Sequence, residues 1–361
     1  MRTVTRRSLL VFATALPFTL AGRLVPGQTT RHVVSGDNVA IYNLIGNLRL
    51  QGGTGTSVVV EVTAGGADGR QLRVETGPIR GRETLRVRYP AGDLIAGGDM
   101  AGDWGYGSTE VRVREDGTFG GEGGRRGEWD GDMVRIRTRG RGAEAYADLT
   151  VSLPTGKRIA LFLAVGKVSV SNVDGQILVD VQSAGITADK TRGTLTLDTG
   201  SGEIRLTDAQ GDINLETGSG SVTVTSIRGT SLRIDTGSGS VDATDVEVGA
   251  LSIDTGSGGV DVRRANSPSI NIDTGSGAVD VTLLADVELL NIDTGSGGVT
   301  VAVPADMGAM VDIDTGSGDI DLGFPVQVRR MQSDHVSGQI GDGRGRINIE
   351  TGSGGVRLLR S

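Results

Sequence analysis

The sequence predicts an all-β fold: a right-handed parallel β-helix (solenoid) of about eleven 18–21-residue turns, preceded by a smaller β-rich N-terminal module. An acidic residue followed by Thr-Gly-Ser-Gly recurs through the second half of the chain at nearly constant intervals. Apolar and polar residues alternate between these strings, and no helical periodicity occurs from 160 to 361. Repeats of this length are typical of solenoids, in which one unit stacks on copies of itself.

The first 27 residues have the pattern of an export signal. Three arginines precede an apolar run, Leu9–Leu20, that is too short to span a bilayer. Cleavage after Ala21 or Gly27 would place a small residue at the cut, and both Sec and twin-arginine signals fit. Later segments lack the roughly 20 apolar residues of a membrane helix. We therefore expect residues 1–27 to be removed and the protein to reach the periplasm, the cell surface or the medium without a membrane anchor.

The sequence of residues 28–150 predicts the smaller β-rich module. The expected strands are Ser57–Thr63, Gln71–Thr76, Thr84–Tyr89, Thr109–Arg114, Met133–Thr138 and Ala147–Leu153. The segment 91–132 is rich in Gly, Asp and Arg, which indicates long exposed loops. Val39–Leu50 echoes Val168–Ile177, so a turn of the repeat type is expected near the start of the mature chain.

Residues 151–361 predict the repeat domain. The acidic residue of the repeated string is Asp198, Glu216, Asp235, Asp254, Asp273, Asp293, Asp314 and Glu350, with steps of 18, 19, 19, 19, 20, 21 and 36 residues. The long last step contains a weaker copy at 334–340. Asp180 and Phe162 extend the same phase backwards at intervals of 18 residues.

Each repeat reads as short strands joined by a tight corner. Leu251–Ile253 and Val260–Val262 alternate with period two, as half-buried strands do, and Thr-Gly-Ser-Gly lies between them. Successive units should pair in parallel, and right-handed winding is the default for parallel crossovers. Glycine should supply the positive φ of the corner.

Composition excludes several classes of protein. The absence of Cys excludes disulfides, thiol nucleophiles and a lipidated N-terminal Cys, and only two His are available for acid–base or metal chemistry. Residues 151–361 carry 27 acidic against 16 basic side chains, whereas 29–150 carry 17 against 16. Because an acidic rod repels phosphate groups, nucleic acid and anionic lipid are not expected partners.

The repeats resemble the bacterial putative-adhesin family of unknown function, which is related to the β-helical heads of GIN-type adhesins. The matching elements are Leu149–Pro154, Val165–Val168 and the eight corners between Thr199 and Gly354. The resemblance implies an exported parallel β-helix that belongs to the cell envelope or surface. It carries over no catalytic residues, because the family defines none.

Sharper interpretations of the corner string are less consistent with its periodicity. Asp-Thr-Gly-Ser also occurs in aspartic proteases, but those use one copy per lobe, not eight in series. The stacked carboxylates could bridge calcium, although solvation and turn N–H donors are the simpler expectation. A threonine ladder of the ice-binding kind would need a flat face, whereas these threonines border a corner. We expect a non-enzymatic protein with no catalytic residue, no cofactor and no metal site.

A specific partner site is expected in the 91–132 loops, because the repeats offer only repetitive contacts. The candidate residues are Trp104, Tyr106, Arg125, Arg126 and Trp129. Exposed aromatic rings beside Arg suit a surface glycan or an envelope protein, and packing into a small satellite core is the alternative interpretation.

Two classes of function compete with this discrete interaction module. One is an envelope scaffold that polymerises end to end, and the other is a polysaccharide-binding or polysaccharide-cleaving β-helix. The ends of the rod distinguish the polymerising scaffold from the discrete module, because a scaffold needs exposed strand edges there. Arg346, Arg357 and Arg360 surround the last repeat, Ile347–Leu359, which suggests a terminal edge protected by charge.

Overall fold

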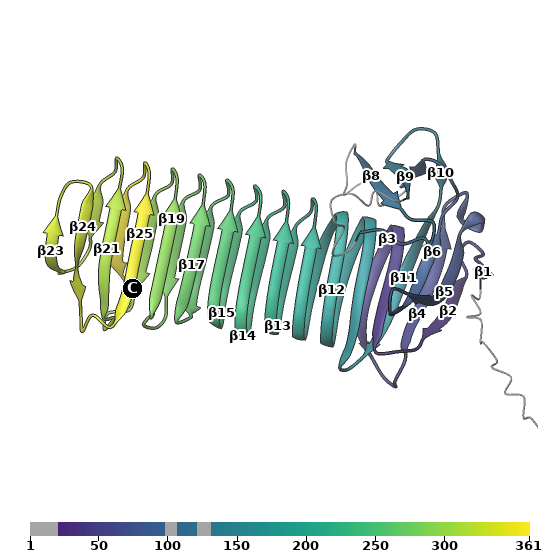
Figure 1. Cartoon of the computed structure of the whole chain (residues 1–361), viewed down its shortest axis with the longest axis horizontal. Helices are drawn as coiled ribbons and strands as arrows, with labels where there is room; N and C mark the ends of the chain where they lie inside the picture. Colours follow the sequence, from purple (N-terminus) through teal and green to yellow (C-terminus); the bar gives the residue numbers. More distant parts are fainter. Residues whose placement is uncertain (1–20, 98–106, 121–130) are drawn as a thin grey trace, which may run out of the picture.

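The computed structural model describes residues 21–97, 107–120 and 131–361, and they form an elongated rod with a small second sheet beside its N-terminal end (Figure 1). The rod is one 22-stranded sheet, and the second sheet has four strands. In the described part of the chain the one helical element is the 3-10 turn η1 (Gly69–Gln71), and no helix there is long and apolar enough to cross a membrane. The expected all-β fold is confirmed.

The strands fall into three groups along the chain. The N-terminal strands are β1 (Ala21–Arg23), β2 (Thr29–Val34), β3 (Asn38–Gly53), β4 (Val58–Gly65), β5 (Arg73–Ile79), β6 (Arg82–Arg88) and β11 (Tyr146–Pro154). The second sheet contains β7 (Leu94–Ile95), β8 (Ser108–Val113), β9 (Asp132–Arg137) and β10 (Ala143–Glu144). The remaining strands are β12 (Lys157–Thr199), β13 (Ile204–Thr217), β14 (Val222–Thr236), β15 (Val241–Thr255), β16 (Val260–Asn266), β17 (Ser269–Thr274), β18 (Val279–Leu283), β19 (Leu289–Thr294), β20 (Val299–Val303), β21 (Ala309–Thr315), β22 (Ile320–Leu322), β23 (Gln327–Met331), β24 (His335–Ile340), β25 (Gly345–Thr351) and β26 (Val356–Arg360).

The repeats stack in parallel, as expected. Strands β12 to β15 pair in the order of the chain. β15 then pairs with both β16 and β17, β16 pairs with β18, and β17 pairs with β19. Thr236 is in register with Thr255, and Thr255 with Thr274. Equivalent side chains of successive repeats therefore form continuous rows along the rod, about 4.8 Å apart.

Aliphatic side chains fill the inside of every turn. In β15, Val241, Ala243, Val246, Leu251 and Ile253 are almost completely buried, and their counterparts above and below are buried in the same way. One turn contributes few apolar side chains, so each layer depends on the layers stacked on both sides.

The winding path bends at positions with left-handed backbone, which lie away from the Thr-Gly-Ser-Gly corner. Positive φ recurs once per turn at non-glycine residues: Asn172, Lys190, Asp208, Ser226, Asp245 and Arg264, with φ between 52° and 60°. The corner glycines have no positive φ. The expectation that glycine supplies positive φ at this corner is therefore wrong.

The first turn of the rod comes from β3, ahead of the second sheet in sequence. Val39 is the parallel partner of Ile159, and Leu48 is the partner of Val168. The expected early turn is therefore present, but the alignment of Val39 with Val168 was wrong by nine residues. Strands on both sides of residue 150 pair in one sheet, while β2, β4 and β5 close this end of the rod with antiparallel pairs.

The last turns do not stack in the order of the chain. β19 pairs with β25, and β25 pairs with β21, so the final repeat lies between two earlier ones (Figure 1). β26 is likewise placed between β20 and β22. In the stacking order, the layer next to β19 and β20 is therefore formed by residues 345–360, and the layer beyond it contains β21 and β22.

Two expectations about this end are therefore wrong. Residues 334–340 do not form a parallel turn, because β24 pairs antiparallel with β21 and with β23. The last repeat is not a terminal edge protected by arginines, because it has a strand on each side. The end is formed instead by the β23–β24 hairpin, on which Val328 and Met331 are exposed beside Arg329 and Arg330.

The second sheet covers the outer face of the first turns. Leu94, Val111, Phe119 and Ile136 pack with apolar residues of β3 and β12 in a second buried cluster. Phe162 stacks on Tyr42 at 4.5 Å between ring centroids, and Phe119 meets both rings edge-on. The described part of the 91–132 segment therefore forms a satellite core over the rod.

Candidate binding groove

The Thr-Gly-Ser-Gly corners stack into a ridge along the rod. Each corner threonine is buried, and its Oγ1 donates a hydrogen bond of 2.9–3.1 Å to a backbone carbonyl in the corner of the neighbouring layer. Thr255, for example, donates to Gly239 and accepts from the N–H of Gly258. The threonine row therefore stabilises the ridge from inside and offers no exposed ligand face.

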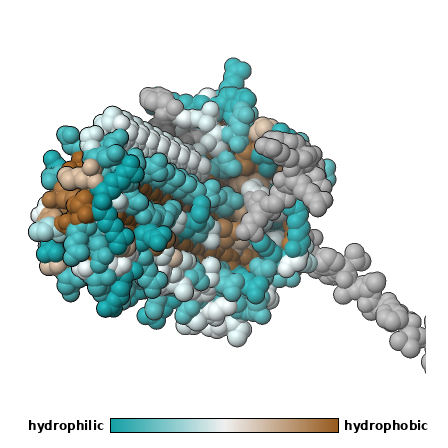
Figure 2. All heavy atoms as spheres, turned by 60° about the vertical axis from the view of Figure 1, so that its left-hand side comes forward, coloured by the Kyte–Doolittle hydropathy of each residue, from teal (hydrophilic) through white to brown (hydrophobic). Residues whose placement is uncertain are grey.

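Close stacking explains the corner glycines. A Cβ at Gly239 would lie 1.8 Å from the carbonyl oxygen of Gly220 in the layer below, and Gly258 and Gly297 have the same contact. A backbone can approach the carbonyl of the next layer this closely only where its own residue has no Cβ. Figure 2 shows the resulting ridge as a pale band of small residues bordered by hydrophilic surface.

The acidic residues of the corners form a row on one side of the ridge. Asp254 lies between Asp235 and Asp273 in the strand register, and the row continues from Asp293 to Glu350 and then Asp314. His335 ends the row with its Nδ1 3.3 Å from Asp314. Within the described ranges, no group of three or more acidic, His or Cys side chains has a geometry that could hold a metal ion.

The acidic row changes character where the second sheet covers it. Towards the N-terminal end, the position of Asp198 and Asp180 is occupied by Phe162 in the next layer and by Tyr42 in the layer after that. Both rings lie in the satellite core. Burial, reinforced by the charges of Asp180 and Glu216, raises the pKa of Asp198 to about 6. Burial also raises the pKa of Asp254, with smaller contributions from Asp235 and Asp273.

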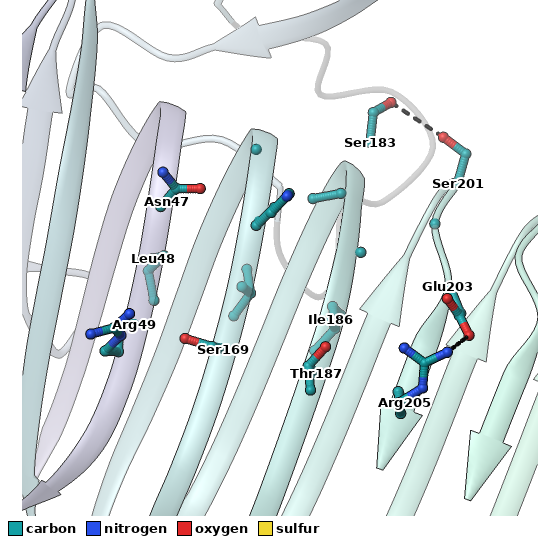
Figure 3. A pocket seen from close by; sticks show the side chains of 16 residues that line it. Asn47, Leu48, Arg49, Ser169, Ser183, Ile186, Thr187, Ser201, Glu203 and Arg205 are labelled. Carbon is teal, nitrogen blue, oxygen red and sulfur yellow. Dashed lines mark hydrogen bonds and ion pairs between the residues drawn. The ribbon is translucent and has the colours of Figure 1, made fainter. Parts of the chain in front are cut away.

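A groove of about 720 Å³ lies on the other side of the ridge, over the first four layers (Figure 3). Its floor is the outer face of β3, two successive turns of β12 and the start of β13. Ser183 and Ser201 form its rim with a 3.3 Å hydrogen bond, and Thr109 of β8 donates to or accepts from Ser183 at 2.7 Å. The groove therefore borders the second sheet.

A missing side chain creates the hollow. One outward row contains Asn47, Lys167, Gly185 and Glu203, so Gly185 leaves a gap between longer neighbours. A Cβ at Gly185 would meet only the carbonyl oxygen of Glu203, at 3.6 Å. Space at this position therefore lies outside the chain and is open to a ligand.

The charge of the groove differs from that of the same face further along. Arg49, Lys167 and Arg205 line it with one carboxylate, Glu203, which pairs with Arg205 (Figure 3). The row that contains Arg49 and Arg205 continues in later layers as Thr223, Asp242, Asp261 and Asp280. The groove is therefore a cationic region on an acidic rod.

The residues expected to bind a partner cannot be compared with this groove. Trp104, Tyr106, Arg125, Arg126 and Trp129 all lie outside the described residues. The groove itself was not predicted from the sequence, because the repeats were treated as uniform. The available signal was the size and charge of the residue after the corner: Lys167, Gly185 and Glu203 are unlike, whereas the later layers have Ser, Gly or Ala at every copy except Asp319.

One protein family matches the repeat region of the chain. Residues 147–359 match the family described as Toastrack DUF4097, and the chain belongs to this family. A search of curated proteins finds no match. One solved structure, described as a "putative cell adhesion protein" from Clostridium sporogenes, is 9% identical, with 92% of this chain and 99% of that chain covered and a TM-score of 0.17.

Proposed function

We propose that this protein is a non-catalytic, exported interaction module of the cell envelope or surface, and that it contacts its partner through the groove beside the second sheet. The rod then acts as a spacer. The observation that carries the proposal is the break in the repeat: unlike side chains gather in one hollow, next to rows of nearly identical residues. Unique surface is what specific recognition requires.

Other observations support a discrete module over a polymerising scaffold. At one end the β23–β24 hairpin pairs antiparallel with β21, and at the other end β4 and β2 add antiparallel strands beyond β11. Neither end therefore presents a complete parallel turn on which a second copy could continue the repeat. Membership of the Toastrack family, whose function is not defined, is compatible with a non-enzyme. Right-handed winding and about eleven turns are part of the same proposal.

A steric block of the groove tests the proposal. Gly185→Leu fills the hollow with no backbone clash, and Gly259→Leu makes the same change at the equivalent position four layers along, where a Cβ would also meet only a carbonyl at 3.5 Å. Binding of the purified protein to cell-envelope material from its own source should be lost in Gly185→Leu and kept in Gly259→Leu. Equal binding by both variants would refute the assignment.

Export is tested separately. The signal at residues 1–27 predicts a shortened mature protein outside the cytoplasm. Cell fractionation with mass spectrometry of the N-terminus checks this, and an intact N-terminus on cytosolic protein would contradict it.

A further inference from the structure

We propose that the groove binds a polysaccharide that carries carboxylate groups, such as a polymer of uronic acids; this inference rests on the proposed function and names its ligand class. The first reason is charge. Three cationic side chains and one carboxylate line the groove, on a chain of net charge −8. A local excess of positive charge on an acidic protein attracts anions to that place and repels them elsewhere.

The spacing of the cations favours an extended ligand. Arg49 belongs to β3, Lys167 to the first turn of β12 and Arg205 to β13, with the Gly185 layer between the last two. At about 4.8 Å per layer, Arg49 and Arg205 are roughly 14 Å apart along the rod. A small anion cannot reach both, whereas a chain lying along the groove can.

The lining also favours a hydroxylated polymer over a peptide. Ser169, Thr187, Ser183 and Ser201 present hydroxyl groups, which donate to and accept from sugar hydroxyls (Figure 3). The apolar lining residues Leu48, Val168, Ala184 and Ile186 are all buried. The side chains that a ligand would meet in the groove are therefore polar or charged.

Each charged group has a distinct task in this arrangement. Arg49 and Arg205 present guanidinium groups, which bind carboxylates through two parallel N–H donors. Glu203 holds Arg205 through their ion pair and keeps acceptor capacity for a sugar hydroxyl. A polymer with one charge per sugar matches this mixture of cations and hydroxyls, whereas a densely charged polyphosphate would also be repelled by the nearby acidic rows.

The experiment is calorimetric titration of the full mature protein with oligogalacturonate, a neutral glucan of similar length, and polyphosphate. We expect binding of oligogalacturonate alone, weakened by salt. Arg49→Gln with Arg205→Gln should weaken it about tenfold or more. The matched control, Arg233→Gln with Arg263→Gln, removes the same charge from exposed positions on the repeats and should change affinity by less than about twofold.

The outcomes separate this inference from the proposed function. Equal loss in both double variants, or tighter binding of glucan or polyphosphate than of oligogalacturonate, would overturn the ligand class. If oligogalacturonate does not bind but Gly185→Leu still abolishes attachment to envelope material, the ligand class is wrong and the groove assignment stands. If neither oligogalacturonate binding nor attachment depends on the groove, both fail.

Discussion

The two ends of the rod are built from the same repeat and closed in different ways. At the N-terminal end, one outward row changes from carboxylates to aromatic rings, and the row after the corner, which is mostly Ser, Gly or Ala in later layers, has Lys, Gly and Glu. A second sheet packs beside them. At the C-terminal end the row of corner carboxylates continues through Asp293 and Glu350 to Asp314, and the chain inserts its own last repeat as an inner layer. Outward positions are free to vary, because the fold depends on the inward ones.

This difference indicates where function lies. The uniform part satisfies the demands of stacking: buried aliphatics, threonine hydrogen bonds and glycines at the ridge. The charged side chains of the groove, Arg49, Lys167, Glu203 and Arg205, are outside these sets, and under the function proposed above a ligand accounts for their departure from the repeat. The inserted repeat, in contrast, is explained by stacking, because it fills the layer between β19 and β21.

The largest expected effect is deletion of residues 345–361, which removes a layer that contacts repeats on both sides. Ile347, Ile349, Val356 and Leu358 are buried there, and their burial stabilises the fold by roughly 6–12 kcal/mol. Limited proteolysis should digest the chain beyond Val303 and leave the earlier turns and the groove intact. Deletion of Ser361 alone is the control. Continued protection of 309–340 in the shortened protein would show that the last repeat is peripheral.

A smaller but sharp effect is expected from one methyl group on the ridge. Gly239→Ala should destabilise the rod by about 3 kcal/mol or more, because the Cβ would overlap a backbone carbonyl. Gly185→Ala in the groove should leave stability almost unchanged. Urea unfolding followed by circular dichroism measures both. Similar losses in the two variants would mean that the groove glycine is also structural.

The smallest effect lies at the boundary between the two regions. The pKa of Asp198 is raised to about 6, above the ordinary value of 3.8, so its ionisation opposes folding. Asp198 is protonated in both states well below pH 3.8, stability falls as the pH rises from 3.8 to about 6, and the contribution is constant once both states are ionised. The fall is about 2 kcal/mol, less than the full shift implies, because solvent screens this partly exposed carboxyl. Asp198→Asn should remove this fall and raise stability at pH 7.

Thermal unfolding at pH 4, 5, 6 and 7 measures the effect. Asp254→Asn should act in the same direction and to a smaller extent, since burial also raises the pKa of Asp254 but its side chain is more exposed. Loss of stability in Asp198→Asn at pH 7 would contradict the expected direction of this pH dependence.

The sequence predicted the parts of the fold that depend on a local pattern. Alternation identified the strands, and the corner string identified the register of each layer against the next. It could not predict the order of the last layers, because the repeats at Asp314 and Glu350 carry the same string and present the same surfaces to a neighbour. When repeats are interchangeable, their stacking order depends on the segments that connect them. In this chain that connection is the segment that folds into the β23–β24 hairpin.

The candidate site was harder to find for a related reason. Periodicity directs attention to what recurs, whereas the groove results from a departure at Gly185 and from strands that are far apart in the chain. Arg49 and Arg205 are separated by 156 residues in the sequence and lie on one face only because β3 is the first layer. The register error in that layer concealed their alignment.

The most direct test of the central claim, that the last repeat of the chain is inserted between two earlier layers of the rod, is disulfide trapping in a chain that has no native Cys. Asn291 and Asn348 are direct neighbours whose side chains form a 2.8 Å hydrogen bond, while Asp312 lies one layer further on. Layers about 4.8 Å apart fit the Cα separation of a disulfide, and twice that distance does not. The double variant Asn291→Cys with Asn348→Cys should oxidise within a monomer, and Asn291→Cys with Asp312→Cys should stay reduced. The reverse result would show that the layers follow the order of the chain.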